Sequence, residues 1–328
     1  MTQIIRWGIL STGLIAKKFA EGLQAVPDAQ LIAVGSRSQE SADEFGERFS
    51  IPKRHASYEA LVNDPDVDVI YIGTPHNFHQ ENMLLCLNAG KHVLCEKPFT
   101  VNAPEAAEVI ALAREKGLFL MEAMWSRYFP AMVKLRELLA EKAIGDVMLV
   151  QADFGYRMGE ILPEHRIFNP KFGGGALLDV GIYPISLISM IYGKQPERIA
   201  SLTHLGETGV DELSVMTFAY GKNQSAIATT AIQVDTQHEA WICGTKGRIH
   251  IPHFWRATGL TLYKNGEEAQ PISMPINGNG YNYQAQEVGE CIRAGKPESA
   301  IMPLDESLAI MQTMDTIRAE WDLKYPME

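Results

Sequence analysis

Asp179 and Tyr183 lie in an apolar stretch that follows three glycines, Gly173-Gly174-Gly175. They are four residues apart in the chain, so on a helix both side chains project from one face. An unperturbed tyrosine has a pKa of about 10, but a nearby lysine ammonium favours the phenolate and makes the group a usable acid or base at neutral pH. The pair predicts proton transfer, although a tyrosine on an apolar helix is also compatible with a place in the core.

Lys97 is a second candidate for the chemistry of a cofactor site. It lies in Cys95-Glu96-Lys97-Pro98, directly after a predicted strand. Ligands of doubly wound folds bind at the carboxyl ends of the strands, where a lysine can hydrogen-bond the ribose of a nicotinamide cofactor and present its charge to a reacting oxygen. We expect Glu96 to lie beside the same cofactor, and Pro98 permits a cis peptide. The alternative is that Lys97-Pro98 simply begins a loop.

The segment Ser11-Thr12-Gly13-Leu14-Ile15-Ala16 lies between a predicted strand and a predicted helix. In terms of the dinucleotide fingerprint G-x-G-x-x-G/A, Gly13 allows the backbone to approach the phosphates and Ala16 allows the helix to pack on the strand, whereas Ser11 replaces the first glycine. A glycine turn without a ligand is the alternative, and the strand and helix on either side favour the nucleotide. We expect cofactor contacts from Gly8, Ser11, Thr12, Gly13, Leu14 and Ile15.

The end of the second predicted strand indicates which dinucleotide is bound. Sites that prefer NAD place a carboxylate there, but Ala33-Val34-Gly35-Ser36-Arg37-Ser38 contains none, and the first acid is Glu40. Arg37 can pair with a 2′-phosphate and Ser36 can donate a hydrogen bond to it. The segment therefore predicts NADP over NAD, the alternative being a solvated arginine at a strand end.

These side chains require a sheet that brings strand ends together, and the first part of the chain has its pattern. Strands that alternate with helices imply parallel βαβ units in a doubly wound Rossmann sheet. We predict strands at residues 4–10, 30–36, 68–72, 92–95 and 118–122, and helices at 14–26, 40–49, 80–89 and 102–116.

After residue 124 the pattern changes to one that predicts an α/β domain with a mostly antiparallel sheet. Strand-like runs follow one another between residues 198 and 263 with short turns between them, which is typical of antiparallel pairing. Helices are predicted at 130–141, 177–191, 283–294 and 304–321. We therefore predict a nucleotide-binding domain at residues 1–123 and a substrate-binding and dimerisation domain at 124–328.

Composition excludes some classes of partner. The chain has 328 residues, 46% of them hydrophobic, and a formal net charge of −11, so we expect two cores and a surface that repels nucleic acids and anionic membranes. We find no signal-peptide pattern and no apolar run of about eighteen residues. The cysteines are scattered at Cys86, Cys95, Cys243 and Cys291, which predicts a reducing cytoplasm and no zinc site.

These motifs together resemble the Gfo/Idh/MocA family of oxidoreductases over essentially the whole chain. The resemblance rests on the opening fingerprint, Glu96-Lys97-Pro98, residues 174–183 and Gly244-Thr245-Lys246-Gly247. Residues 7–11, 119–130 and 207–211 are most similar to the subgroup of dihydrodiol dehydrogenases and NADP-dependent D-xylose dehydrogenases. That subgroup also has serine where the first fingerprint glycine is expected.

The resemblance implies a Rossmann domain followed by an α/β domain whose large sheet has one open face, through which relatives form homodimers. It places Lys97 and Tyr183 beside the nicotinamide, with Asp179 nearby. Trp125 and Arg127 are expected to overhang the site, with Trp125 stacking on a sugar or aromatic ring. Further expected contacts are Thr74, Pro75, His76 and His79 with the cofactor, and Phe154 and Trp255 with the substrate, although the last two are equally compatible with the core.

We therefore expect reversible oxidation of a hydroxyl group on a sugar or a dihydrodiol. Tyr183 would take the hydroxyl proton, Lys97 would lower its pKa, and a hydride would pass to the nicotinamide. No third ligand accompanies His76 and His79, so no metal is expected. Two alternatives stay open: a ketosugar or anhydrofructose reductase of the same family, and a catalytically silent NADP-binding regulator.

Overall fold

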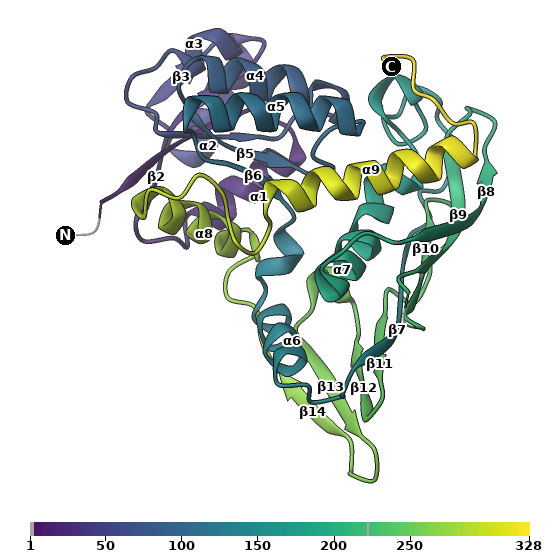
Figure 1. The fold of residues 1–328 in the computed structure, drawn as a ribbon. Coiled ribbons are helices and arrows are strands. Elements are labelled where there is room, and N and C mark those ends of the chain that lie inside the picture. The colour runs from purple at the N-terminus through teal and green to yellow at the C-terminus, as the bar shows by residue number, and fades with distance from the viewer. Residues whose placement is uncertain (1–2, 222) are drawn as a thin grey trace. The chain divides into compact units, whose positions relative to one another are not determined.

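The computed structural model describes residues 3–221 and 223–328, and the chain divides into two compact units (Figure 1). Unit 1 comprises the chain up to Trp125 together with Asn277–Leu308, and unit 2 comprises Ser126–Ile276 and Ala309–Glu328. The sequence analysis predicts two consecutive domains that meet at residue 123. The division differs because α8 (Tyr281–Arg293) packs on α1 and β2 of unit 1, a long-range contact that local patterns do not encode.

Unit 1 is a doubly wound Rossmann sheet, as the sequence predicts. Its six strands are all parallel, in the order β3-β2-β1-β4-β5-β6. The short strand β3 and the short helix α3 are not predicted from the sequence. The strands are β1 (Ile5–Leu10), β2 (Ala29–Gly35), β3 (Lys53–His55), β4 (Val69–Ile72), β5 (His92–Glu96) and β6 (Leu120–Ala123), and the helices are α1 (Leu14–Leu23), α2 (Gln39–Phe49), α3 (Tyr58–Val62), α4 (His79–Asn88) and α5 (Ala103–Lys116).

The core of unit 1 lies between the central strands and α1. Trp7 on β1 packs against Phe19 of α1 with ring centroids 5.3 Å apart, and Phe19 stacks on Tyr71 of β4 at 3.8 Å. Central strands of a parallel sheet are covered on both faces, so they are apolar along their whole length. This packing fixes the carboxyl ends of β1 and β4 relative to the start of α1.

Unit 2 is an α/β unit built on eight strands in the order β14-β13-β12-β11-β7-β10-β9-β8. Every pairing is antiparallel except that of β7 with β10, so the predicted mostly antiparallel sheet is confirmed. The strands are β7 (Val147–Gly155), β8 (Arg198–Leu205), β9 (Asp211–Ala219), β10 (Ser225–Ala231), β11 (Ala240–Gly244), β12 (Gly247–Ile251), β13 (Gly259–Lys264) and β14 (Gln270–Ser273), and the helices are α6 (Pro130–Ala140), α7 (Ile182–Tyr192) and α9 (Leu304–Glu320), within which the division between units falls.

Pro170–Tyr192 contains a segment long and apolar enough to cross a membrane by length and composition. The sequence analysis finds no such run, so that expectation is corrected. In the structure 89% of the eighteen-residue window is buried inside the protein. Its apolar character is therefore explained by the core of unit 2, where α7 contacts β7 and β10.

Candidate active site

The predicted phosphate-binding turn joins β1 to α1. Ser11, in the place of the first fingerprint glycine, has φ +112°, a region that favours glycine. Its hydroxyl oxygen accepts a hydrogen bond from the Gly13 amide at 3.2 Å, and its own amide donates to the Gly35 carbonyl at 3.0 Å. The turn therefore has the backbone of the dinucleotide fingerprint without its first glycine.

The N-terminus of α1 fits a pyrophosphate. No described side chain caps this helix end, and its first turn contains no acidic residue. A Cβ on Gly13 would approach only the Ser11 hydroxyl, at 3.5 Å, and Leu14 is 76% exposed, so a ligand can reach the backbone. Exposed amides at a helix N-terminus bind phosphate.

Two glycines allow close packing near the phosphate-binding turn. A Cβ on Gly8 would lie 3.1 Å from both Leu61 and Val67, so Gly8 serves close packing inside β1, and its contact with the cofactor stays a prediction. Gly73, which the sequence analysis missed, follows β4, and a Cβ there would lie 3.2 Å from Ile15. Its small size allows the loop after β4 to approach the start of α1.

The end of β2 presents Ser36 and Arg37, as predicted. Ser36 is buried and Arg37 is exposed, and Ser38 caps α2 by accepting the Ser41 amide. Burial raises the pKa of Tyr58, and the positive charge of Arg37 opposes that rise, so Tyr58 lies within electrostatic reach of Arg37. The sequence analysis missed Tyr58 because it begins the unpredicted helix α3.

Glu96 and Lys97 lie at the carboxyl end of β5, and the Lys97–Pro98 peptide is cis. The Tyr71 hydroxyl donates to Glu96 Oε1 at 2.6 Å, and the Lys97 amide donates to Oε2 at 3.3 Å. Burial raises the pKa of Glu96 to about 7, although Tyr71 and Lys97 favour the ionised form. Because these contacts use both carboxylate oxygens, Glu96 is placed to orient the strand end that carries Lys97.

His79 is predicted to contact the cofactor, but it is 0% exposed. Its Nδ1 lies 2.8 Å from the Pro98 carbonyl oxygen and its Nε2 lies 2.9 Å from that of Thr74. Burial lowers the pKa of His79. Both ring nitrogens bind backbone, so His79 joins the loops after β4 and β5, and its contact with the cofactor stays a prediction.

The remaining residues of the loop after β4 lie beside His79. Thr74 accepts a hydrogen bond from Asn82 at 3.1 Å, Pro75 precedes the 3-10 turn His76–Phe78, and the His76 ring lies edge-on to that of His79 at 5.9 Å. Among residues 3–221 and 223–328 there is no group of three or more His, Cys, Asp or Glu side chains that could hold a metal ion.

Trp125 and Arg127 follow β6, but tertiary contacts give them different surroundings. The Trp125 indole stacks on Tyr281, with centroids 4.3 Å apart; Tyr281 begins α8, and the sequence analysis missed it. Arg127 is 2% exposed and donates from Nε to the Ser186 hydroxyl at 2.9 Å and from Nη2 to the Ser186 carbonyl at 2.8 Å. Arg127 therefore has a structural role against α7, and its contact with the cofactor stays a prediction.

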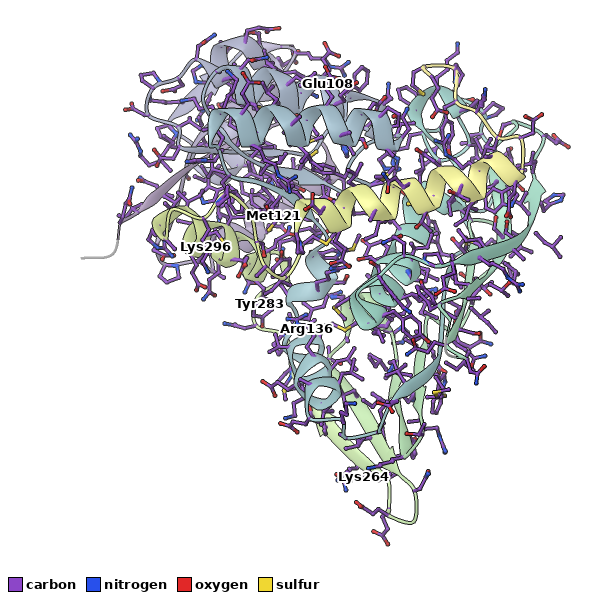
Figure 2. The ribbon with its side chains drawn as sticks, in the orientation of Figure 1. Glu108, Met121, Arg136, Lys264, Tyr283 and Lys296 are labelled. Atoms are coloured by element: carbon purple, nitrogen blue, oxygen red, sulfur yellow. The ribbon has the colours of Figure 1, made fainter. Side chains whose placement is uncertain are left out.

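Arg127 is held in place from α6 as well. Arg136 on α6, labelled in Figure 2, donates to the Arg127 carbonyl oxygen at 2.7 Å. Ser186, which Arg127 binds, lies one helical turn after Tyr183 on α7. Arg127 therefore helps to fix the start of α7.

Asp179 and Tyr183 lie in unit 2, Asp179 in a π-helical segment, Leu177–Gly181, and Tyr183 in the first turn of α7. The Asp179 carboxylate accepts hydrogen bonds from the Tyr156 hydroxyl at 2.8 Å and from Arg166 at 2.9 Å. Burial raises the pKa of Tyr156, and Asp179 raises it further, whereas Asp179 is also the main cause of the raised pKa of Arg166. Sequence patterns suggest Tyr156 only as a weaker candidate for the substrate wall and do not suggest Arg166, because neither contact with Asp179 is visible in local order.

Phe154 and Trp255 form one aromatic cluster with Tyr183. Phe154 meets the Tyr183 ring edge-on at 5.3 Å and stacks on Trp255 at 5.0 Å. The Trp255 indole donates to His238 Nδ1 at 3.4 Å, and His238 Nε2 donates to the Gly155 carbonyl at 2.6 Å. Unit 2 therefore has two stacked apolar rings next to Tyr183. His238, which the sequence analysis missed, holds the Trp255 ring in place.

Comparison with family models identifies both parts of the chain. Residues 5–124 match the model of the Gfo/Idh/MocA oxidoreductase family with an NAD-binding Rossmann fold, and residues 132–250 match the Gfo/Idh/MocA C-terminal domain. The trans-1,2-dihydrobenzene-1,2-diol dehydrogenase of Mus musculus is 41% identical, and that of Xenopus tropicalis is 40% identical. These alignments cover 99% and 98% of this chain, respectively, and 99% of each relative.

Solved structures are similar over nearly the whole chain. A 3-ketoreductase from Actinomadura kijaniata, in complex with NADP and TDP-benzene, has a TM-score of 0.86 at 26% identity, covering 97% of this chain and 98% of that one. The aldose-aldose oxidoreductase of Caulobacter crescentus has a TM-score of 0.88 at 23% identity, covering 97% of each chain, which shows the fold alone. On the family models and the full-length relatives, the chain belongs to the Gfo/Idh/MocA family of oxidoreductases.

Proposed function

We propose that the chain is an NADP-dependent oxidoreductase that transfers a hydride between the nicotinamide and a hydroxyl or carbonyl group of a sugar or a dihydrodiol. The observation that carries the proposal is the arrangement around Tyr183, a tyrosine at the start of α7 that is bordered by Phe154 and directly follows the segment bearing Asp179. The names of the full-length relatives, which are dihydrodiol dehydrogenases, support the same substrate class.

In the direction of oxidation, the Tyr183 phenolate takes the proton of the substrate hydroxyl, and in reduction the phenol returns it. The nicotinamide supplies the hydride acceptor or donor when it is bound. The Lys97 ammonium favours the phenolate by its charge, and Glu96 orients the peptide that carries Lys97. The Phe154 and Trp255 rings offer an apolar face to the substrate ring and exclude water from the reacting atoms.

The proposal is tested by Tyr183→Phe. We expect this variant to bind NADPH with wild-type affinity, measured by fluorescence titration, while kcat falls by about 100-fold or more because general acid–base catalysis is lost. Turnover within about threefold of wild type would remove Tyr183 from the acid–base role and, with it, this proposal.

NADP is proposed over NAD because no carboxylate lies at the end of β2, where Ser36 and the exposed Arg37 lie. Removal of a charge-assisted hydrogen bond to a phosphate costs about 1.5–3 kcal/mol, or roughly 10- to 150-fold in affinity. Arg37→Ala should weaken NADP by this factor and leave the affinity for NAD within about twofold, whereas Arg48→Ala, which removes an exposed arginine of α2, should affect neither. Equal losses for the two cofactors would contradict the assignment.

We also propose a homodimer formed through one face of the sheet in unit 2. Leu202 on β8 is 80% exposed, and its neighbour Val215 on β9 is also exposed, as is Leu213. Exposed apolar patches of this kind mark interfaces. Sedimentation should give about twice the chain mass of 36.4 kDa, and Leu202→Glu should yield monomers, unlike Leu162→Glu, which changes an exposed leucine outside the strands. A monomeric wild-type protein would refute the proposal.

Reduction of a ketosugar is the second candidate, favoured by the similarity to the 3-ketoreductase. The same tyrosine and lysine serve both directions, so the residues alone do not separate the candidates. A panel of aldoses, ketoses and trans-dihydrodiols, assayed in both directions by NADPH absorbance, discriminates between them through the ratio of kcat/KM values.

A further inference from the structure

Three glycines, residues 173–175, form a turn that leads into the π-helical segment, and we call them the glycine turn. Gly175 has φ +109°, and its amide donates to the Ile167 carbonyl at 2.8 Å. A Cβ on Gly174 would lie 2.7 Å from the carbonyl oxygens of Arg166 and Ile167. The turn is therefore packed against backbone on one side, and its position decides where the helix bearing Asp179 begins.

Asp211, at the start of β9, fixes this helix start. Its Oδ2 accepts the amide of Leu177, the first residue of the π-helical segment, at 2.7 Å. A Cβ on Gly175 would overlap Oδ1 of the same carboxyl group. Amides at a helix N-terminus have no partner within the helix, so a buried carboxylate is an effective anchor for them.

Tyr325 fixes the turn from another part of the chain. Its hydroxyl donates to the Gly174 carbonyl oxygen at 2.8 Å, and the residue is 2% exposed. Tyr325 lies in residues 323–328, which follow α9 and which we call the tail. The Tyr325 hydroxyl therefore binds a turn that lies 151 residues earlier in the sequence.

The tail is itself held by the buried guanidinium of Arg318. Arg318 on α9 donates to both carboxylate oxygens of Glu328, at 2.7 and 2.8 Å, and its guanidinium lies over the Tyr325 ring, 4.9 Å from the centroid. The Tyr325 amide donates to the same Glu328 carboxylate at 2.8 Å. A bidentate pair of this kind restricts geometry as well as adding energy, so the phenol is presented to the turn in one orientation.

We propose that Tyr325 and Asp211 are positioning residues for the chemistry at Tyr183: together they hold the glycine turn, and through it the helix start that places Asp179 and Tyr183. The inference rests on the proposed acid–base role of Tyr183. A displacement of about 1 Å in a reacting group is enough to cost on the order of 100-fold in rate, so an anchor that never touches the substrate still affects kcat.

The test is Tyr325→Phe, with Tyr192→Phe as the matched control. The Tyr192 hydroxyl also donates to a backbone carbonyl, that of Ser225 at 2.6 Å. Tyr192 is the last residue of α7, at the opposite end of the helix from Tyr183. We expect Tyr325→Phe to lower kcat by about tenfold, since one buried carbonyl loses its donor, with KM for NADPH unchanged within about twofold. Hydrogen exchange of amides 176–183 should become faster in Tyr325→Phe and stay at the wild-type rate in Tyr192→Phe.

An unchanged kcat in Tyr325→Phe overturns the inference, whether or not exchange becomes faster, and so does an equal fall of kcat in Tyr192→Phe. Failure of the proposed function is detected separately, because Tyr183→Phe would then keep its turnover. Should Tyr325→Phe not fold, Asp211→Asn keeps the size of the side chain, weakens its bond to the Leu177 amide, and must give the same split between kcat and KM.

Discussion

The buried carboxyl group of Glu96 makes the stability of unit 1 depend on pH in a direction opposite to that of most carboxylates. Burial raises its pKa from 4.5 to about 7. A raised pKa in the folded state means that protonation favours folding, so this contribution is complete below pH 4.5 and is lost as the pH rises through about 7. The difference of about 2.5 units, at about 1.36 kcal/mol for each, sets an upper limit of about 3 kcal/mol.

Glu96→Gln removes this titration and keeps an oxygen that can accept the Tyr71 hydroxyl. The free energy of opening is measured by hydrogen exchange of the β4 and β5 amides between pH 4.5 and 8, in wild type and variant. The free energy of opening of the wild type minus that of the variant should fall by up to about 3 kcal/mol as the pH rises across this range. A difference that is flat, or that increases with pH, would refute the burial argument.

Asp64 is the control with the opposite sign, in the same unit. Burial alone would raise its pKa, but hydrogen bonds from Lys53, the Asp66 amide and His55 lower it from 3.8 to about 2. The stabilisation by Asp64 is therefore present above pH 3.8 and is lost as the pH falls towards 2. Asp64→Asn should leave the pH dependence between 4.5 and 8 as in wild type.

Three further changes test the backbone and packing arguments. Ser11→Gly should increase the free energy of unfolding by about 1 kcal/mol at most, because φ +112° costs a serine more than a glycine. The melting temperature, measured without cofactor, should therefore rise; a lower one would show that the hydrogen bond of the Ser11 hydroxyl outweighs the strain. Gly175→Ala should destabilise unit 2 by about 3 kcal/mol or more in urea unfolding, since its Cβ would overlap Asp211 at φ +109°, whereas Gly209→Ala, at φ +84° with open space, should cost about 1 kcal/mol. Ser186→Ala should cost about 1–3 kcal/mol, because the buried Arg127 guanidinium loses an acceptor; a loss under about 0.5 kcal/mol would contradict its role in holding α7.

The sequence predicted those features that depend on local order along the chain. Alternation of β-branched and helical segments predicted the parallel sheet of unit 1, and the strand ends placed Ser36, Arg37 and Lys97 at its carboxyl edge. The spacing of apolar residues and the residue types at turns depend on neighbouring positions, so they can be read from a single sequence. Resemblance to a family then connected Lys97 with Tyr183, which spacing alone could not have paired.

Other assignments depended on contacts that no local pattern contains. Position 8 in β1 requires a small residue because Leu61 and Val67 lie close to Gly8. His79 binds two carbonyl oxygens from loops that the sheet brings together. A polar side chain contacts whichever groups the fold presents to it, so its type and position in the sequence do not decide between a ligand contact and a structural one.

The phosphate-binding turn after β1 and the residues around Tyr183 show the difference between what the sequence and what the tertiary structure determine. By itself the sequence determined that a strand, a tight turn at Ser11–Gly13 and a helix follow one another, because each depends on residues only a few positions apart. Only the tertiary structure decided that Tyr156 and Arg166 bind Asp179, and that Tyr325 binds Gly174. The physical reason is that these hydrogen bonds join distant segments, whose approach is set by the packing of the core and not by local preference.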